Sequence, residues 1–283
     1  MFINYLIDFF IFLFGLCIGS FLNCFIYRLE QGKSLKGRSF CPRCKHILSW
    51  QDLFPVFSFL FLQGKCRYCH KKISAQYPLV ELATGILFIL IFLNLQYTTN
   101  LAPAKFVVWL NLSFLFYVTS ALIVIFVYDL KHYLIPDKVL FPAIITAFIY
   151  KFFINLSLSH WSLIENLKLK IDNYASITNF LFAVLVASGF FFIIFLVSGG
   201  RWMGFGDVKL AALMGLLLGL GNVLIALFLA FFLGAIIGII LMVFKGKGLK
   251  SEIPFGPFLI AGTFIAMFWG QEIINWYTRF FLF

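Results

Sequence analysis

Apolar runs of about 20 residues recur from one end of the chain to the other, and a run of that length crosses a bilayer as one helix. Hydrophobic residues make up 63% of the 283 positions, which is more apolar surface than a soluble domain of this size can bury. The sequence therefore predicts an all-α polytopic membrane protein with about eight transmembrane helices. The predicted spans are residues 3–26, 77–96, 106–128, 138–155, 178–198, 208–220, 223–244 and 256–276.

The basic residues are distributed unevenly between the segments that join these runs. Of the 22 Lys and Arg, all but Lys105, Lys151, Lys168, Lys170 and Arg279 lie in or beside segments that alternating spans put on one side. By the positive-inside rule that side is cytoplasmic, so both termini are predicted outside. The first run lacks a basic start and a small-residue cleavage site, which predicts a span rather than a cleaved signal peptide. The net charge is +11, and we expect the basic side chains to bind anionic membrane lipids and not nucleic acid.

The longest polar segment, 27–76, carries two C-x2-C pairs in the pattern C-x2-C-x21-C-x2-C. Each tight turn offers two thiolates to one tetrahedral ion, so the pattern predicts a zinc-ribbon-like loop between the first two helices, with structural Zn2+. The alternative is one or two disulfides, which a reducing cytoplasm disfavours. The expected organisation is a first helix (1–26), this cysteine loop and a transmembrane region (77–283). The predicted ligands are Cys41, Cys44, Cys66 and Cys69.

Two aspartates lie at the ends of predicted spans, where a carboxylate is costly unless it is paired, hydrated or functional. Asp129 ends one apolar run, and Asp207 closes a glycine-flanked stretch at the start of another. The charge distribution puts both on the cytoplasmic side. Two carboxylates in contact share a proton, so that one activates water while the other protonates a carbonyl oxygen. We interpret the pair as the dyad of an aspartyl protease, although their closeness in space is a hypothesis at this point.

Other residues near these positions have both a functional and a structural interpretation. Asp137 is a rival for the first aspartate, or it caps the span that it begins. Lys209 tunes the pair or anchors its helix to lipid. Gly204 and Gly206 permit backbone angles and the close approach of an extended peptide. Glu81 lies inside the start of a span and is expected to line the interior near the dyad.

Two other classes of protein remain open on the residues alone. A non-enzymatic zinc-ribbon membrane adaptor would use the aspartates as helix caps, and replacing them by asparagine would then be harmless. An ion-coupled transporter would hold acids near the bilayer midplane and would have repeated halves, whereas these acids end spans and no repeat is visible.

Several short motifs follow one another along nearly the whole chain. They are Gly19-Ser-Phe-Leu-Asn23-Cys-Phe-Ile-Tyr-Arg28, the two C-x2-C pairs, Pro78-Leu-Val-Glu81-Leu, Tyr128-Asp129-Leu, Ile135-Pro136-Asp137 and Gly204-Phe-Gly206-Asp207-Val-Lys209. In this order they resemble the bacterial type IV prepilin peptidases, the leader peptidase/N-methyltransferase family of GxGD aspartyl proteases. G-x-G-D alone is a weak pattern, but it becomes specific together with the cysteine loop and a partner aspartate.

The resemblance implies that Asp129 and Asp207 are the catalytic pair. The implied substrates are prepilins or pseudopilins of type IV pilus or type II secretion systems, cut on the cytoplasmic side of the bacterial inner membrane after a glycine. The family's second activity is N-methylation of the new N-terminal residue with S-adenosylmethionine. We expect that site near the cysteine loop and Glu81, and the sequence has no glycine-rich dinucleotide fingerprint for it.

Overall fold

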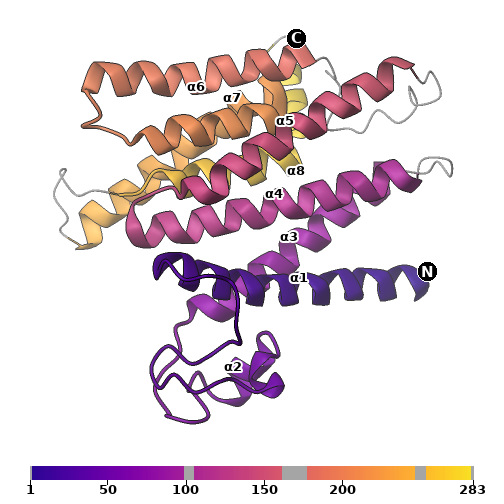
Figure 1. The fold of residues 1–283 in the computed structure, drawn as a ribbon. Coiled ribbons are helices and arrows are strands. Elements are labelled where there is room, and N and C mark those ends of the chain that lie inside the picture. Colours follow the sequence, from indigo (N-terminus) through magenta and orange to yellow (C-terminus); the bar gives the residue numbers. More distant parts are fainter. Residues whose placement is uncertain (1, 99–104, 161–176, 246–252, 282–283) are drawn as a thin grey trace. The chain divides into compact units, whose positions relative to one another are not determined.

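The computed structural model describes residues 2–98, 105–160, 177–245 and 253–281, and these are mostly helical. The long helices, followed in Figure 1, are α1 (Phe2–Glu30), α3 (Gln76–Thr98), α4 (Lys105–His132), α5 (Asp137–His160), α6 (Ile177–Ser198), α7 (Phe205–Lys245) and α8 (Gly256–Phe281). Four of the lysines that were counted for the predicted orientation in the membrane lie outside the described residues: Lys168, Lys170, Lys247 and Lys250.

Helix α7 is about twice as long as one span requires, and it folds back on itself at Gly219. Gly219 has φ 71° and ψ 176°, which is outside the helical region. The contacts with α6 show the reversal. Phe205 at the start of α7 contacts Phe195 near the end of α6, Gly219 lies beside Phe180 near its beginning, and Phe231 contacts Phe191 back toward its end. When the two legs are counted separately, the described residues contain eight long helical segments. This agrees with the eight apolar runs in the sequence, although not every segment qualifies as a membrane span.

Six of the described helices are both long and apolar enough to cross a membrane, namely α1, α3, α4, α6, α7 and α8. Helix α5 is of span length but more polar, since it carries Asp137, Lys138 and Lys151. Large apolar side chains point outward from the helices, and Leu185 of α6 and Phe228 of α7 are each 69% exposed. Such side chains contact lipid in a bilayer. The chain is a multi-pass membrane protein, as the sequence predicted.

The contacts divide the chain into two compact units. The first contains residues 1–97 and 111–124, which include α1, the cysteine loop, α3 and the middle of α4. The second contains residues 98–110 and 125–283, which include both ends of α4 and helices α5 to α8. The two candidate aspartates both belong to the second unit, and the four cysteines all belong to the first.

Helices α1 and α3 of the first unit pack at short range because glycine lets their backbones approach. A Cβ atom on Gly19 of α1 would lie only 2.6 Å from the Cα of Glu81 in α3. Beyond this contact, Phe88 of α3 stacks on Phe116 of α4 with ring centroids 3.9 Å apart. The start of α3 is therefore fixed beside the second half of α1.

Arg28, near the end of α1, organises the first part of the cysteine loop. The residue is only 5% exposed, and its guanidinium donates to the carbonyl oxygens of residues 34, 35, 36, 37 and 38. The bond to the carbonyl of Gly37 is 2.9 Å long. Because the carbonyls satisfy the buried cation, the chain has to curl around it as it leaves the helix. This fixes the path of the loop toward the cysteines.

Candidate functional site

Asp129 lies near the end of α4, and Asp207 lies in the first turn of α7. Both are buried, at 4% and 8% exposure, so the two carboxylates are largely removed from solvent. The two acids have a common neighbour in Ile135: a Cβ atom on Gly256 would lie 2.5 Å from Oδ2 of Asp129 and 3.5 Å from Ile135, and one on Gly206, next to Asp207, would lie 3.1 Å from Ile135. The structure therefore brings together two acids that are far apart in the sequence, at the meeting of two helix ends.

The glycine motif places Asp207 at the start of a helix. Gly204 immediately precedes α7, and its carbonyl accepts the backbone N–H of Asp207 at 3.2 Å. The backbone N–H of Gly204 in turn donates to the Asp207 carboxylate. An acid in the first turn that reaches back to the cap residue forms half of a capping box. The unpaired amides at a helix N-terminus also stabilise negative charge there.

The glycines of this motif supply space rather than unusual backbone angles. Neither Gly204 nor Gly206 has a positive φ, whereas Gly199 and Gly200 just before them do. A Cβ atom on Gly206 would lie 3.1 Å from the Cβ of Ile135, in the connection between α4 and α5. Gly206 therefore lets this connection lie directly against the start of α7.

Asp129 has a partner that the sequence analysis missed. The backbone N–H of Gly256, the first residue of α8, donates to its carboxylate. A Cβ atom on Gly256 would lie 2.5 Å from Oδ2 of Asp129, so any other residue type would force the carboxylate or the start of α8 to shift. The amide is available because the first N–H groups of a helix have no intrahelical acceptor. The signal in the sequence is Pro254-Phe255-Gly256-Pro257 at the start of the last apolar run.

Asp137 and Lys209 form an ion pair that joins the first turns of α5 and α7. The Lys209 ammonium also lies 5.1 Å and 5.5 Å from the ring centroids of Phe141 and Phe205. The Lys209 side chain is 19% exposed, whereas that of Asp137 is 54% exposed. The pair links the two helix starts.

The four cysteines come together into one cluster, in which the Sγ atoms all lie within 4.8 Å of one another. All four are free thiols, whereas a disulfide would hold two sulfurs at about 2.05 Å. Tetrahedral zinc with Zn–S bonds of about 2.3 Å separates its sulfurs by roughly 3.8 Å, which this cluster can accommodate. The imidazole of His46, beside the first cysteine pair, contacts the ring of Tyr68, with the two ring centroids 3.7 Å apart. The four thiols can hold one metal ion.

The two C-x2-C pairs form the same turn. In the first, the N–H of Lys45 donates to the carbonyl of Cys41, and in the second that of His70 donates to Cys66, both at 2.9 Å. Lys45 and His70 have φ values of 62° and 54°. Burial raises the pKa of the Cys41 thiol, but hydrogen bonds from the backbone amides of Cys44 and its neighbour outweigh it and bring the pKa to about 7. The thiolate, which is the metal-binding form, is favoured at Cys41 but not at Cys44 or Cys66. A hydrogen bond from the backbone of His46 lowers the pKa of Cys44, but burial and the neighbouring Cys41 and Cys69 thiols outweigh it and raise the pKa to about 11. Burial also raises the pKa of Cys66.

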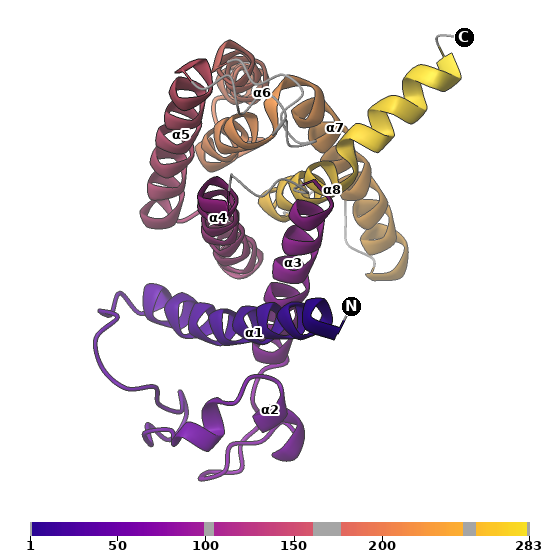
Figure 2. The ribbon, with the colours of Figure 1, turned by 90° about the vertical axis from the view of Figure 1, so that its right-hand side faces the viewer.

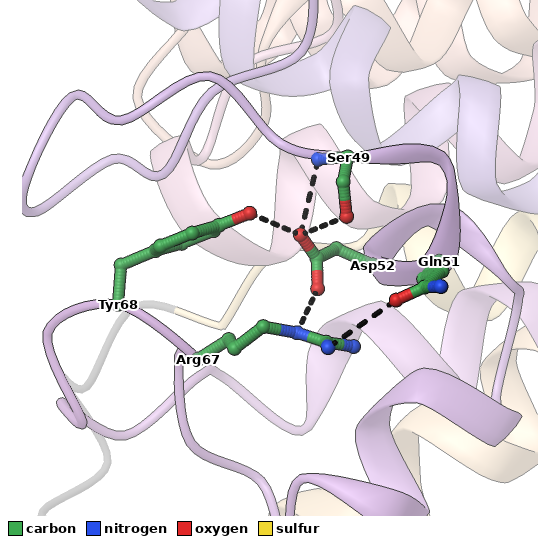
Figure 3. A network of polar contacts seen from close by, with 5 residues as sticks. All are labelled: Ser49, Gln51, Asp52, Arg67 and Tyr68. Atoms are coloured by element: carbon green, nitrogen blue, oxygen red, sulfur yellow. Dashed lines mark hydrogen bonds and ion pairs between the residues drawn. The ribbon is translucent and has the colours of Figure 1, made fainter.

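Asp52 links the second cysteine turn to the segment between the two turns (Figure 3). Its Oδ2 accepts the backbone N–H of Ser49 at 3.0 Å, the Ser49 hydroxyl at 2.8 Å and the Tyr68 hydroxyl at 3.1 Å. Its Oδ1 pairs with Nε of Arg67 at 2.7 Å. Burial raises the pKa of Asp52, but the hydrogen bonds from Ser49, Tyr68 and Arg67 outweigh it and hold the pKa below its usual value.

We predict that Asp52→Asn destabilises the cysteine loop by about 1–3 kcal/mol, because several donors to a side chain that is only 4% exposed lose a charged acceptor. Hydrogen–deuterium exchange over 39–75 measures the change. The lowered pKa stabilises the folded loop above the unfolded value of about 3.9, and this stability is lost as the pH falls through the folded pKa. The control is Gln51→Ala, which removes a single 3.4 Å bond to Arg67. Equal exchange in both variants would contradict the prediction.

Glu81 is buried at 6% exposure, and its carboxylate ties the cysteine loop to α3. Its Oε2 accepts the backbone N–H of Val56 at 2.7 Å, and the Ser20 hydroxyl of α1 also donates to the carboxylate. The expected position of Glu81 inside the first turns of a span agrees with the start of α3 at Gln76. Its part in binding a methyl donor stays a prediction.

Two family models match the chain in succession. The model described as "Bacterial Peptidase A24 N-terminal domain" matches residues 13–95, and the model described as "Type IV leader peptidase family" matches residues 116–239. The first match includes the cysteine cluster and Glu81, and the second includes both buried aspartates. The two models together therefore cover every residue of the candidate site except Gly256.

Similar proteins occur in distant bacteria and carry the name "Prepilin leader peptidase/N-methyltransferase". The protein of Legionella pneumophila is 32% identical over 94% of this chain and 92% of its own length. That of Aeromonas hydrophila is 32% identical over 96% of this chain and 94% of its own. That of Bacillus subtilis (strain 168) is 30% identical over 95% and 97%. No solved structure matches the chain.

Proposed function

The chain belongs to the type IV leader peptidase family, and on that premise we propose that it removes the leader of prepilins or pseudopilins and then methylates the new N-terminal residue. The observation that carries the proposal is the pair of buried carboxylates, Asp129 and Asp207, whose charges interact. The likeness to the relatives extends over nearly their whole length, which supports the same two activities here.

We assign proteolysis to Asp129 and Asp207. Two interacting carboxylates hold one proton between them, so the pair contains a base and an acid at once. The ionised carboxylate takes a proton from water, and the water oxygen attacks the carbonyl carbon of the glycine before the scissile bond. The other carboxyl protonates the carbonyl oxygen. The C–N bond then breaks as the leaving nitrogen takes the proton that was removed from water and becomes the new N-terminus. The carbonyl re-forms as one hydroxyl of the intermediate returns its proton to the other aspartate.

Two helix-start amides position the dyad in this mechanism. The N–H of Gly204 holds the Asp207 carboxylate, and the N–H of Gly256 holds that of Asp129. Each amide occupies one side of its carboxylate, which leaves the remaining lone pairs for water and substrate. Because Gly204 directly precedes α7 and Gly256 begins α8, helix packing fixes both carboxylates before substrate arrives.

Methylation is assigned to the first unit. When bound, S-adenosylmethionine would supply a methyl group to the freed nitrogen. The N–C bond forms as the S–C bond breaks, and the nitrogen loses a proton. We propose that residues 27–76 serve this step and that 77–283 serve cleavage. Glu81 already accepts the N–H of Val56, so we assign it to holding the loop in place and leave its contact with the methyl donor as a prediction.

We propose that the metal held by the cysteines is zinc in a structural role, because four thiolates close the coordination sphere. The purified protein is expected to contain about one zinc per chain, and Cys44→Ser to lose most of it. Metal analysis by mass spectrometry measures this. Cys24→Ser, in α1 and outside the cluster, is the matched control and should keep its zinc. Equal zinc in both variants, or none in the wild type, would refute the assignment.

The orientation in the membrane follows from the basic residues. We propose that the chain lies in the bacterial cytoplasmic membrane with the cysteine loop and both aspartates on the cytoplasmic side and both termini outside. A prepilin leader is then cut on the cytoplasmic side, where the precursor is synthesised. Membrane lipids and prepilins are the proposed partners, and nucleic acid is not among them.

The test of the function uses the purified protein in lipid nanodiscs with a prepilin-like peptide that has an apolar helix after its leader. Mass spectrometry is expected to find the leader removed after glycine, and the product heavier by one methyl group only when S-adenosylmethionine is present. A folded protein that leaves the peptide intact would favour a membrane adaptor instead. Cleavage without methylation would remove the second activity alone.

We predict that Asp137→Asn lowers kcat/KM for cleavage by less than about tenfold, because its partially exposed ion pair with Lys209 contributes only about 0.2–1 kcal/mol. Steady-state cleavage kinetics and a thermal melt measure the two effects. The dyad variant Asp129→Asn is the comparison. If Asp137→Asn were as inactive as that variant, Asp137 would be a member of the catalytic pair rather than a clamp.

A further inference from the structure

Within residues 50–61, between the two cysteine turns, five large apolar side chains are at least half exposed, and we call them the apolar face. They are Trp50, Phe54, Phe57, Leu60 and Phe61, and their exposures run from 50% for Phe57 to 85% for Phe61. The face belongs to a 3-10 turn, η1 (Trp50–Leu53), and the short helix α2 (Phe57–Phe61). A group of exposed apolar side chains marks an interaction site, whereas apolar side chains that are exposed singly are ordinary on protein surfaces.

The segment that carries the apolar face is tied to a candidate membrane span. Val56, which directly precedes α2, donates its N–H to Glu81, and Glu81 lies inside the candidate span Gln76–Leu95. Figure 2 shows α2 near the start of α3. Glu81 in turn lies against Gly19, which is roughly 16 Å from the end of α1 at a rise of about 1.5 Å per residue. A turn tied to this level of two spanning helices lies within the leaflet rather than out in the solvent.

The turn that presents α2 is strained and is held by the same bond. Val56 has φ 62° and ψ −51°, which a β-branched residue rarely adopts. The N–H of Phe57 donates to the carbonyl of Pro55 at 2.6 Å and closes a γ-turn, a form that is rare because it is strained. The Glu81 carboxylate accepts the N–H at the centre of this turn. The γ-turn and its bond to Glu81 together set the direction in which α2 points away from α3.

The charges around the apolar face are those of a surface that binds anionic lipid. Residues 31–75 contain nine Lys and Arg and a single acid, Asp52. That acid is already paired with Arg67. A basic segment with exposed aromatic side chains is typical of chains that lie in the membrane interface. Head groups of negative charge are attracted to such a segment by electrostatics.

We propose that the apolar face inserts into the head-group and acyl boundary of the leaflet, as a shallow second anchor of the cysteine loop, and that its occupant is a bilayer containing anionic lipid. The anchor and the Glu81 bond then hold the cysteine cluster at a fixed height beside α1 and α3. This inference does not depend on the proposed enzymatic activities. A protein partner or a second copy of the chain would cover the face in a different way, which the following test distinguishes.

The test measures the depth of single side chains by electron paramagnetic resonance on the full chain in nanodiscs that contain phosphatidylglycerol. p-Acetylphenylalanine replaces Phe61 or Phe57, which is a conservative change at an exposed ring, and carries a nitroxide label. Position 43, exposed in the first cysteine turn, is the water reference, and position 185 on α6 is the lipid reference. Melting curves confirm that each labelled protein is folded.

The ratio of oxygen to nickel-chelate accessibility is expected to be several-fold higher at positions 57 and 61 than at position 43, and to approach that at 185. A ratio like that at position 43 would overturn the proposal, because the face would then lie in water. Low accessibility to both reagents would also overturn it, because a protein would then cover the face. Replacing phosphatidylglycerol by a neutral lipid is expected to lower the ratio, and an unchanged ratio would refute the electrostatic part.

Discussion

Asp129→Asn and Asp207→Asn are each expected to lower kcat for prepilin cleavage by roughly 10²–10⁴-fold, since an amide can neither hold the shared proton nor accept one from water. Asparagine keeps the shape of the side chain and can still accept the helix-start amide that each carboxylate accepts. The fold is therefore expected to persist. Cleavage measured by mass spectrometry under single-turnover conditions gives the rate.

A peptide that lacks its leader from the start provides the internal control for both dyad variants. Its methylation by S-adenosylmethionine should proceed at the wild-type rate, because the aspartates belong to the second unit and the cysteine loop to the first. Normal cleavage by either variant would remove that aspartate from the mechanism. Loss of methylation together with cleavage would indicate that the variant had unfolded.

Gly256→Ala is expected to lower kcat for cleavage by about 10²-fold with little change in KM, because a misplacement of about 1 Å at a catalytic group has a cost of this order. The added Cβ would lie 2.5 Å from Oδ2 of Asp129, so the carboxylate or the start of α8 has to move. Steady-state kinetics separate kcat from KM. The expected split distinguishes a displaced catalytic group from a lost substrate contact.

Gly189→Ala is the matched control for this prediction. Gly189 lies in α6, and a Cβ atom there would meet nothing within 4 Å. It should leave both the melting temperature and the rate of cleavage unchanged. If Gly256→Ala cleaved as fast as Gly189→Ala, the contact between the start of α8 and Asp129 would have no part in the reaction.

The helices and the two aspartates could be predicted because their signals are local. An apolar run reports its own length, and a carboxylate at the end of a run is anomalous without knowledge of its neighbours. The cysteine pairs are equally local, since each forms its own turn and a single ion needs four thiolates. The reversal at Gly219 was also visible as a boundary between the runs 208–220 and 223–244.

The contacts that complete the site could not be predicted because they join distant parts of the chain. Gly256 matters through Asp129, and nothing in a single sequence relates the start of the last run to the end of the third. The pairing of Asp137 with Lys209 is of the same kind, so that each was interpreted separately as a cap or an anchor. Glu81 was expected to face the interior, whereas its bond to Val56 required the path of the cysteine loop.

The first leg of α7 is too short to reach across a bilayer of ordinary thickness. Between Asp207 and Gly219 the helix rises about 18 Å, whereas the hydrocarbon layer is about 30 Å thick. When the turn at Gly219 lies at the far surface, the membrane must thin around this leg or admit water to meet the carboxylate. On the proposed role of Asp207, the scissile bond therefore lies below the ordinary level of the head groups. A pilin precursor can reach it while most of its apolar helix remains in the lipid.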